Sequence, residues 1–232
     1  MFVVCDATNG FPLGIFQDNR YLTDMRTGAA GAICVKHFVA PHHKKVGYIG
    51  AGVIGKAMAR ASHQIHKFEE GYVFGLDKKM SHQFADELTE ELGFPHYVCD
   101  SSEEACRAAD CIFTQTPGTV PVLELGWLKP HATIIASGSD QPTKNEIPSE
   151  VMRNSKFIAD LKRQCVRVGE LRTAIKEGAM SENDVYAEIG DVINGTRKGR
   201  EGDELIVVDL TGTGAQDAAI GQVAWEVLST NK

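Results

Sequence analysis

Short apolar segments alternate with amphipathic segments along most of the chain. Each apolar segment is rich in Val, Ile, Phe and Tyr, which is typical of a buried strand. This pattern predicts strands at 46–50, 72–77, 96–100, 111–117, 132–138 and 156–160, with helices at 50–64, 81–93, 101–109, 122–130 and 166–180. Regular alternation of this kind favours an α/β fold built on a Rossmann-type, doubly wound parallel sheet.

The two ends of the chain depart from this alternation. Residues 1–17 are predicted to form a β-hairpin, because apolar runs flank a turn between Asp6 and Gly10. Residues 21–39 place small and apolar residues at helical spacing, and Thr23 or Asp24 would cap that helix. Residues 204–210 form a late apolar strand, which a Gly-rich turn connects to a final helix. We therefore expect further α and β elements around the central sheet.

Composition narrows the class of protein. The 232 residues are 43% hydrophobic and carry a net charge of -7, which fits a globular metabolic protein and argues against a nucleic-acid binder. The sequence offers neither a membrane-spanning apolar run nor a signal-peptide pattern, so a cytoplasmic protein without membrane contact is expected. The six cysteines form no C-x-x-C pair and the histidines have no ligand spacing, so we expect reduced thiols and no metal.

A Gly-rich hexapeptide, GAGVIG at 50–55, follows the first strand of the alternation and opens a helix. This G-x-G-x-x-G pattern lets the backbone turn tightly and approach a pyrophosphate at the helix N-terminus. Asp77 follows 22 residues after Gly55 and would accept hydrogen bonds from a ribose, which favours NAD. Lys78 and Lys79 would instead attract a 2′-phosphate, so NADP stays an alternative. Asp77 could also serve only as a helix cap.

Three other segments carry polar side chains that are candidates for a site. Arg26 lies among small residues at a helix start, where its guanidinium would meet an anion or form a surface ion pair. Asp140 follows the fifth strand, where it would exchange a proton with substrate or only close a turn. The turn at 209–217 would border the nicotinamide or merely connect a strand to a helix.

Four motifs in this order resemble the family of ornithine cyclodeaminase, mu-crystallin and archaeal alanine dehydrogenase. They are LTDMRTGAAGA at 22–32, VGYIGAGVIG at 46–55, SGSDQPTKNEI at 137–147 and VDLTGTGAQD at 208–217. The resemblance extends over residues 2–228, and the third motif also resembles the ectoine-utilisation branch. It implies that Asp140 is the proton donor and acceptor and that Thr211 borders the substrate. The positions implied to bind the cofactor are Arg26, Thr27, Gly50, Gly52, Val53, Ile54, Gly55, Asp77, Thr116, Lys144 and Leu210.

The resemblance also implies the chemistry. Such cyclodeaminases use NAD to oxidise an L-amino acid to an imine, which cyclises with loss of ammonia and takes the hydride back, as in the conversion of L-ornithine to L-proline. Related activities are those of a ketimine reductase and an alanine dehydrogenase. Two alternatives remain: a non-catalytic or substrate-impaired NAD(P)H-binding protein like mu-crystallin, and an unrelated Rossmann dehydrogenase or epimerase.

Family members have a longer N-terminal region with an arginine and a lysine that bind the substrate carboxylate. No counterpart is visible here, so we expect either a truncated chain or a short form that borrows this surface from another subunit. The resemblance implies three parts: a remnant of the substrate and dimerisation domain at 1–40, the dinucleotide-binding domain at 41–205, and a segment at 206–232 that returns to the first part. A homodimer is expected, because the hairpin leaves open strand edges.

Overall fold

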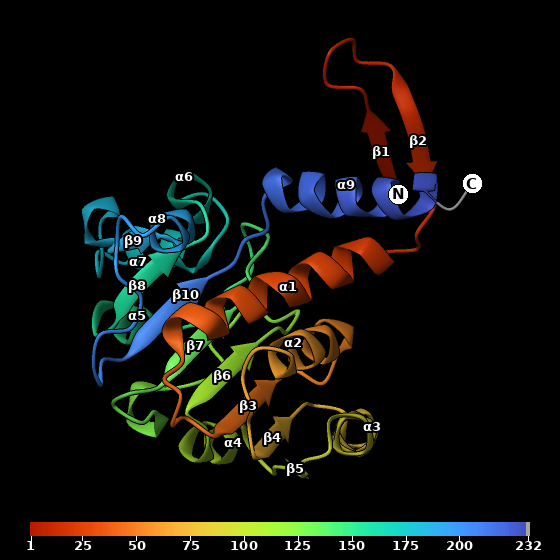
Figure 1. The fold of residues 1–232 in the computed structure, drawn as a ribbon. Coiled ribbons are helices and arrows are strands. Elements are labelled where there is room, and N and C mark those ends of the chain that lie inside the picture. The colour runs from red at the N-terminus through yellow and green to blue at the C-terminus, as the bar shows by residue number, and fades with distance from the viewer. Residues whose placement is uncertain (231–232) are drawn as a thin grey trace.

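The computed structural model describes residues 1–230. Its centre is a parallel sheet of eight described strands in the order β5-β4-β3-β6-β7-β10-β8-β9 (Figure 1). The strands are β3 (Lys45–Ile49), β4 (Glu70–Phe74), β5 (His96–Val98), β6 (Cys111–Thr114), β7 (Thr133–Ala136), β8 (Lys156–Ala159), β9 (Ala187–Glu188) and β10 (Ile206–Asp209). The first six strands in this order have the arrangement of a dinucleotide-binding fold, which confirms the predicted Rossmann-type sheet.

Helices cover both faces of the sheet, because the side chains of each strand alternate between two apolar layers. In β6, Cys111 and Phe113 face one layer and Ile112 faces the other. The first layer is completed by α1 (Tyr21–Phe38), α2 (Val53–His63), α3 (Lys78–Leu92) and α8 (Ile189–Ile193). The second layer is completed by α4 (Ser102–Ala108), α5 (Ser149–Arg153), α6 (Lys162–Cys165) and α7 (Glu170–Lys176).

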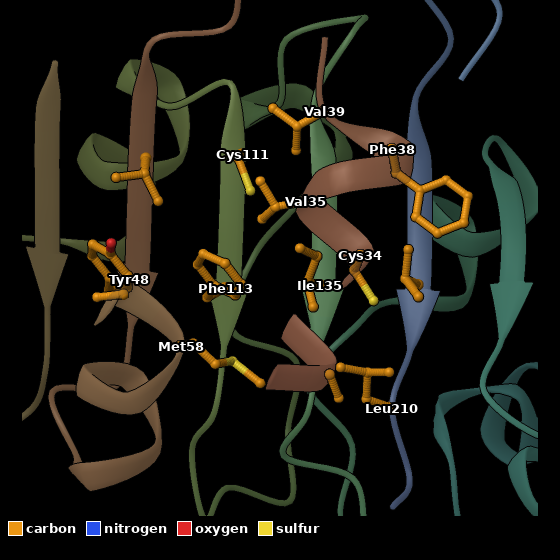
Figure 2. Packing of buried hydrophobic residues seen from close by; sticks show 14 of the residues in the cluster. Cys34, Val35, Phe38, Val39, Tyr48, Met58, Cys111, Phe113, Ile135 and Leu210 are labelled. Atoms are coloured by element: carbon orange, nitrogen blue, oxygen red, sulfur yellow. The ribbon is translucent and has the colours of Figure 1, made fainter. Parts of the chain in front are cut away.

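Helix α1 crosses the middle of the sheet. Figure 2 shows Cys34, Val35 and Phe38 of this helix above the strands that carry Phe113 and Ile135. All five side chains are buried. Burial of an aromatic or branched side chain contributes roughly 1.5–3 kcal/mol to the free energy of unfolding. The contact between α1 and the sheet is therefore a main source of stability. The segment at 1–40 is thus joined to the sheet through the buried face of α1.

The terminal elements lie beyond α1. Strands β1 (Phe2–Cys5) and β2 (Pro12–Phe16) form an antiparallel hairpin, as predicted, and α9 (Gly214–Thr230) packs against α1 and β1 (Figure 1). Strand β10, which precedes α9, lies between β7 and β8 inside the large sheet. The predicted segment at 206–232 therefore combines a strand of the central sheet with a helix outside it. The three-part division of the chain remains a prediction.

Several local predictions were wrong. Helix α1 begins after Arg20, which has a φ of 74°, rather than at Thr23 or Asp24, and Asp18 Oδ2 accepts the N–H of Leu22. The helix predicted at 122–130 is only a 3₁₀ turn, η1 (Leu125–Trp127). The sequence pattern also missed α5, α6, β9 and a second 3₁₀ turn, η2 (Glu182–Asp184). These elements are short, so they carry too few turns to show a period.

Candidate functional site

The three glycines of the turn after β3 differ in what surrounds them. Gly50 has a φ of 107°, and a β-carbon there would lie 2.8 Å from the carbonyl oxygen of Gln115. A β-carbon on Gly55 would lie 2.8 Å from Gln115 Nε2 and 3.1 Å from the Phe84 ring. A β-carbon on Gly52 would meet no atom within 4 Å. Two glycines are therefore required by packing, and the third leaves open space for a ligand.

Helix α2 offers an anion-binding end beside that open space. Its N-cap is Gly52, which supplies no side-chain cap, and its first turn contains no acidic residue. The N–H groups of a first helical turn have no partners within the helix, and the helix dipole adds positive potential there. The structure thus places unpaired N–H groups where a phosphate would approach.

A cavity of about 480 Å³ opens next to this turn, at the carboxyl ends of β3, β4 and β6. The strand order reverses between β3 and β6, which is where open α/β sheets bind ligands. Gly50, Gly52, Asp77 and Thr116 line the cavity, together with apolar residues. Leu76, another lining residue, is 97% exposed. The cavity is therefore apolar on its walls and polar at the glycine turn.

Asp77 has a structural duty in addition to any contact with a ligand. Its Oδ1 accepts the N–H groups of Lys79 at 2.9 Å and Met80 at 3.1 Å and so caps α3. The neighbouring Lys78 binds Asp100 at 2.7 Å and the carbonyl oxygen of Cys99 at 2.9 Å. The capping function that the sequence left open is present, while Oδ2 makes neither capping bond.

A second cavity, of about 130 Å³, lies at the carboxyl ends of β7 and β10. It is lined by residues from each of the four sequence motifs, including Arg26, Thr27, Ile54, Asp140, Leu210 and Thr211. Asp140 is 52% exposed, and its Oδ1 accepts a hydrogen bond from Lys144 Nζ at 2.7 Å. Folding thus gathers an acid, two arginines and four hydroxyl groups from segments that are far apart in the sequence.

Arg26 is held by the last helix. Its Nε donates to Asp217 Oδ1 at 3.1 Å, and its Nη1 donates to Gln216 at 3.2 Å. The arginine side chain is only 19% exposed, so this ion pair is better shielded than a pair on an open surface. Asp217 and Gln216 therefore fix the guanidinium at the wall of the second cavity. Neither residue was predicted to have a role, although both lie in the fourth motif.

Two buried glutamates bind segments that lead to the cavities. Glu146 accepts hydrogen bonds from Thr114 Oγ1 at 2.8 Å, Thr116 N at 2.5 Å and Gly138 N at 2.9 Å. Glu170 accepts from Ser139 Oγ at 2.5 Å and from Glu146 N at 2.9 Å. Burial raises the pKa of Glu146, and it raises the pKa of Glu170 to about 7. Sequence reasoning missed both, because Glu170 reads as an ordinary helix residue and Glu146 as part of a loop.

Strand β10 is followed by a loop that Asp160 organises. Asp160 accepts the N–H groups of Thr211 at 2.7 Å and Gly212 at 2.9 Å, and the Thr211 hydroxyl at 2.8 Å. Asp209, which ends the strand, is fully buried, and burial raises its pKa well above the usual range. The loop beside the second cavity is thus held by the Asp160 carboxyl group, whereas the Asp209 carboxyl accepts the N–H of Leu171. An acid at the end of an apolar strand was the available signal for Asp209.

Most of the predicted site positions line one of the two cavities. Gly55 instead packs α2 onto the sheet, the Val53 side chain is 65% exposed, and Lys144 contacts Asp140. Within residues 1–230, no group of three His, Cys, Asp or Glu side chains has the geometry of a metal site. The same residues include no helix of the length and apolarity that a membrane crossing requires.

Comparison with known proteins agrees with this architecture. The family model described as ornithine cyclodeaminase/mu-crystallin family matches residues 1–232. An alanine dehydrogenase from Archaeoglobus fulgidus is 33% identical over 233 residues, which cover 100% of this chain and 71% of that protein. A solved archaeal alanine dehydrogenase dimer with bound NAD has a TM-score of 0.94 and 33% identity, covering 99% of this chain and 71% of that one.

A second solved structure is also similar. Δ1-pyrroline-2-carboxylate reductase from Thermococcus litoralis, in complex with NADH and L-proline, has a TM-score of 0.91 and 28% identity, covering 97% of this chain and 70% of that one. The four sequence motifs, the sheet order and the match to the whole chain agree with one another. The chain therefore belongs to the ornithine cyclodeaminase/mu-crystallin family.

Proposed function

We propose that this chain binds NAD(H) in the larger cavity and catalyses an NAD-dependent oxidation or reduction of an amino acid or a cyclic imine in the smaller one. The observation that carries the proposal is the open space at Gly52, beside unpaired N–H groups and within a cavity of about 480 Å³. A pyrophosphate would accept hydrogen bonds from these N–H groups and occupy the space that a side chain at position 52 would fill. Solved relatives with bound NAD or NADH support the same assignment.

Each end of the dinucleotide has candidate partners. Gly50 and Gly52 with the start of α2 would hold the pyrophosphate, and Asp77 would accept the ribose hydroxyl groups. Thr116 and Leu210 would lie beside the remainder of the cofactor, towards the second cavity. Bound NAD would supply a hydride acceptor, and NADH a hydride donor. Because Asp77 is anionic, it disfavours the extra phosphate of NADP.

The second cavity would hold the substrate. Asp140 is a half-exposed carboxyl group that can take a proton from an amine or return it, with Lys144 fixing one of its oxygens. Arg26 has a guanidinium whose remaining N–H groups can meet the cofactor or a carboxylate near the reacting carbon. Thr211 would border the substrate with its hydroxyl group oriented by Asp160. An α-amino acid, or the imine derived from it, has the complementary groups.

Within this class we propose a cyclodeaminase-type or imine-reducing reaction. In the first case L-ornithine would lose ammonia and close to L-proline; in the second a cyclic imine such as Δ1-pyrroline-2-carboxylate would be reduced to L-proline. The solved reductase that holds NADH and L-proline supports the choice of a five-membered ring. Family relatives with different names share this scaffold, so the substrate has to be found by assay.

We also propose that the chain forms a homodimer. Val3 and Ile15 are paired across the β1–β2 hairpin and are 52% and 59% exposed, and Leu13 is 43% exposed. A two-stranded sheet with apolar residues and open edges is marginal alone and prone to pair with another copy. A related structure is described as a dimer. Sedimentation velocity should show a dimer at micromolar concentration, and a stable monomer would contradict this.

The proposal can be tested by binding and turnover together. NADH titrated into the wild-type chain should change the nicotinamide fluorescence, whereas Gly52→Asp should abolish the change, because its carboxylate would occupy the pyrophosphate position. L-Ornithine with NAD and Δ1-pyrroline-2-carboxylate with NADH are then assayed for ammonia, L-proline and NADH. Gly221→Ala on α9 serves as a control glycine, since its β-carbon would meet only ordinary contacts at 3.7 Å or more.

The outcomes separate the parts of the proposal. Equal NADH affinity in wild type and Gly52→Asp would disprove the cofactor site. NADH binding without turnover of any amino acid or cyclic imine would disprove the catalytic part and select a binding protein. Turnover of one substrate alone would identify the reaction.

A further inference from the structure

Glu146 stands out because it is a fully buried carboxyl group that makes its described hydrogen bonds to uncharged donors. Its three donors come from two segments of chain: Thr114 and Thr116 from the end of β6, and Gly138 from the end of β7. An acid is rarely buried completely without a pairing cation, because desolvation opposes its charge. The segments that this buried acid connects indicate what it does.

The two connected segments are the walls of the proposed site. Residue Thr116 lines the larger cavity, and the segment with Gly138 leads to Asp140, which lines the smaller one. Gly138 is a glycine because a β-carbon there would lie 2.3 Å from Glu146 Cδ. The carboxyl group therefore occupies the space that a side chain at 138 would need. It lies between the cofactor loop and the loop that carries Asp140.

A second carboxyl group fixes the first. Glu170, at the start of α7, accepts the N–H groups of Glu146 and Ile147 and the hydroxyl group of Ser139. Ser139 directly precedes Asp140, so both residues before the proposed proton carrier are held by buried carboxyl oxygens. The position of Asp140 is thus set by the sheet and α7 rather than by its own exposed side chain.

We propose that Glu146 is a positioning residue, which ties the loop at 115–118 to the segment at 137–140 and so sets the distance between the bound cofactor and Asp140. This role rests on the proposed function of the two cavities. It does not require Glu146 to touch the cofactor or the substrate. A shift of either loop would separate hydride transfer from proton transfer, and small misplacements of reacting groups are costly.

The hydrogen-bond pattern requires a carboxylate in particular. One oxygen faces the N–H of Thr116, and the other faces the N–H of Gly138 and the hydroxyl group of Thr114. In Glu146→Gln, one of the two acceptors becomes an NH₂ group that points at a backbone N–H. The amide therefore keeps the shape of the side chain but pushes one loop away. In contrast, Thr114→Val removes one donor and leaves both backbone bonds in place.

A carboxyl group at the other end of β6 offers a control for stability, although it has a pairing cation, Lys129, at 2.7 Å. Asp110 is also a mostly buried carboxyl group that accepts the N–H groups of Lys44 and Lys45, but it lies at the start of β6, away from both cavities. Asp110→Asn should therefore lower the melting temperature without changing binding or turnover. Comparing Glu146→Gln with Asp110→Asn distinguishes a positioning role from a general loss of stability.

The experiment measures the NADH dissociation constant, kcat and KM with Δ1-pyrroline-2-carboxylate, and the melting temperature of the full chain. We expect Glu146→Gln to raise the dissociation constant for NADH about tenfold, which corresponds to roughly 1.4 kcal/mol. We expect kcat to fall by about 100-fold with little change in KM, because geometry is lost rather than substrate contact. Thr114→Val should stay within about threefold of wild type on both measures.

Two results would overturn the proposal. One is a Glu146→Gln variant whose NADH affinity and kcat remain those of wild type. The other is a variant whose losses match those of Asp110→Asn at temperatures well below both melting transitions. If the wild-type chain turns over no substrate, the catalytic proposal fails, yet the NADH affinities of the variants still decide whether Glu146 positions the cofactor loop.

Discussion

At the scale of single residues, Asp77 combines two duties that mutations can separate. Its Oδ1 caps α3, and its charge faces the cavity in which the ribose is proposed to bind. Asparagine caps a helix about as well as aspartate, whereas alanine does not. The neighbouring Lys78 pairs with Asp100. Its charge is therefore directed to Asp100 and does not neutralise Asp77 at the cavity.

The first prediction follows from this separation. Asp77→Asn should keep the melting temperature and reduce the preference for NADH over NADPH, because the anion that repels the 2′-phosphate is lost. Asp77→Ala should reduce the same preference and also lower the free energy of unfolding by about 1 kcal/mol. Fluorescence titrations with both cofactors and urea unfolding check the two effects. A wild-type preference for NADPH would contradict the assignment.

The second prediction concerns Asp140. Asp140→Asn keeps the size of the side chain and can still contact Lys144, but it cannot accept a proton at neutral pH. Turnover should therefore fall by about 10²–10⁴-fold, the usual contribution of a general acid or base. NADH affinity should remain within twofold, because Asp140 lines the other cavity. Steady-state kinetics and NADH titration give the two numbers, and undiminished kcat would remove Asp140 from the mechanism.

At the scale of elements, the close packing of α1 on α2 depends on Gly28. A β-carbon at Gly28 would lie 2.6 Å from the backbone oxygen of Ala57 in α2, and backbone cannot move aside as a flexible side chain can. This contact brings Thr27 and Arg26, on the same helix, to the second cavity. The small residues of the first motif thus serve helix packing and, through it, the site.

The third prediction uses this contact. Alanine normally favours a helix over glycine by up to about 1 kcal/mol, so Gly28→Ala would stabilise an isolated helix. In this protein it should destabilise by roughly 1–3 kcal/mol, because overpacking forces the two helices apart. Gly221→Ala, in α9, should instead be neutral or stabilising, since its β-carbon would lie 3.7 Å from the nearest atom, Val4 Cγ2. Urea unfolding of both variants tests the contrast, and equal effects would refute it.

At the scale of the whole molecule, pH acts on stability through buried histidines at the amino end of the sheet. His43 is 1% exposed, and burial together with the charge of Arg200 and the neighbouring His131 and His42 lowers its pKa from 6.5 to about 4, against a smaller opposing effect of Asp110. The folded chain therefore resists the proton that the unfolded chain accepts. The stability that neutral His43 provides is complete above pH 6.5 and is lost as the pH falls towards 4.

The fourth prediction is a pH-dependent difference between two proteins. The wild-type chain should exceed His43→Gln in unfolding free energy by more at pH 7.5 than at pH 5, by about 1–2 kcal/mol. Glu170 acts with the opposite sign: burial raises its pKa from 4.5 to about 7, so its contribution is lost as the pH rises through 7. Urea unfolding of both proteins at the two pH values isolates the histidine. A pH-independent difference would contradict the assignment to His43.

The sequence predicted the strands of the sheet well, because buried strands leave a local signal of continuous Val, Ile and Phe. It also predicted that the glycine turn, Asp77 and Asp140 follow the ends of strands, because this spacing is local information. It did not predict that β10 lies between β7 and β8 in the sheet. The hydrophobic pattern of a strand shows which of its faces is buried, but not which strands it pairs with. Short elements such as α6 and β9 were missed for want of length.

The sequence alone therefore determined the alternation of strands and helices, the Rossmann-type class and the motifs of the family. Only the tertiary structure decided which polar groups meet: Arg26 with Asp217, Glu146 with Thr116 and Gly138, and Glu170 with Ser139. The reason is physical. A strand or helix is fixed mainly by neighbours a few residues away, whereas a buried carboxyl group is stable only where donors from distant segments converge on it.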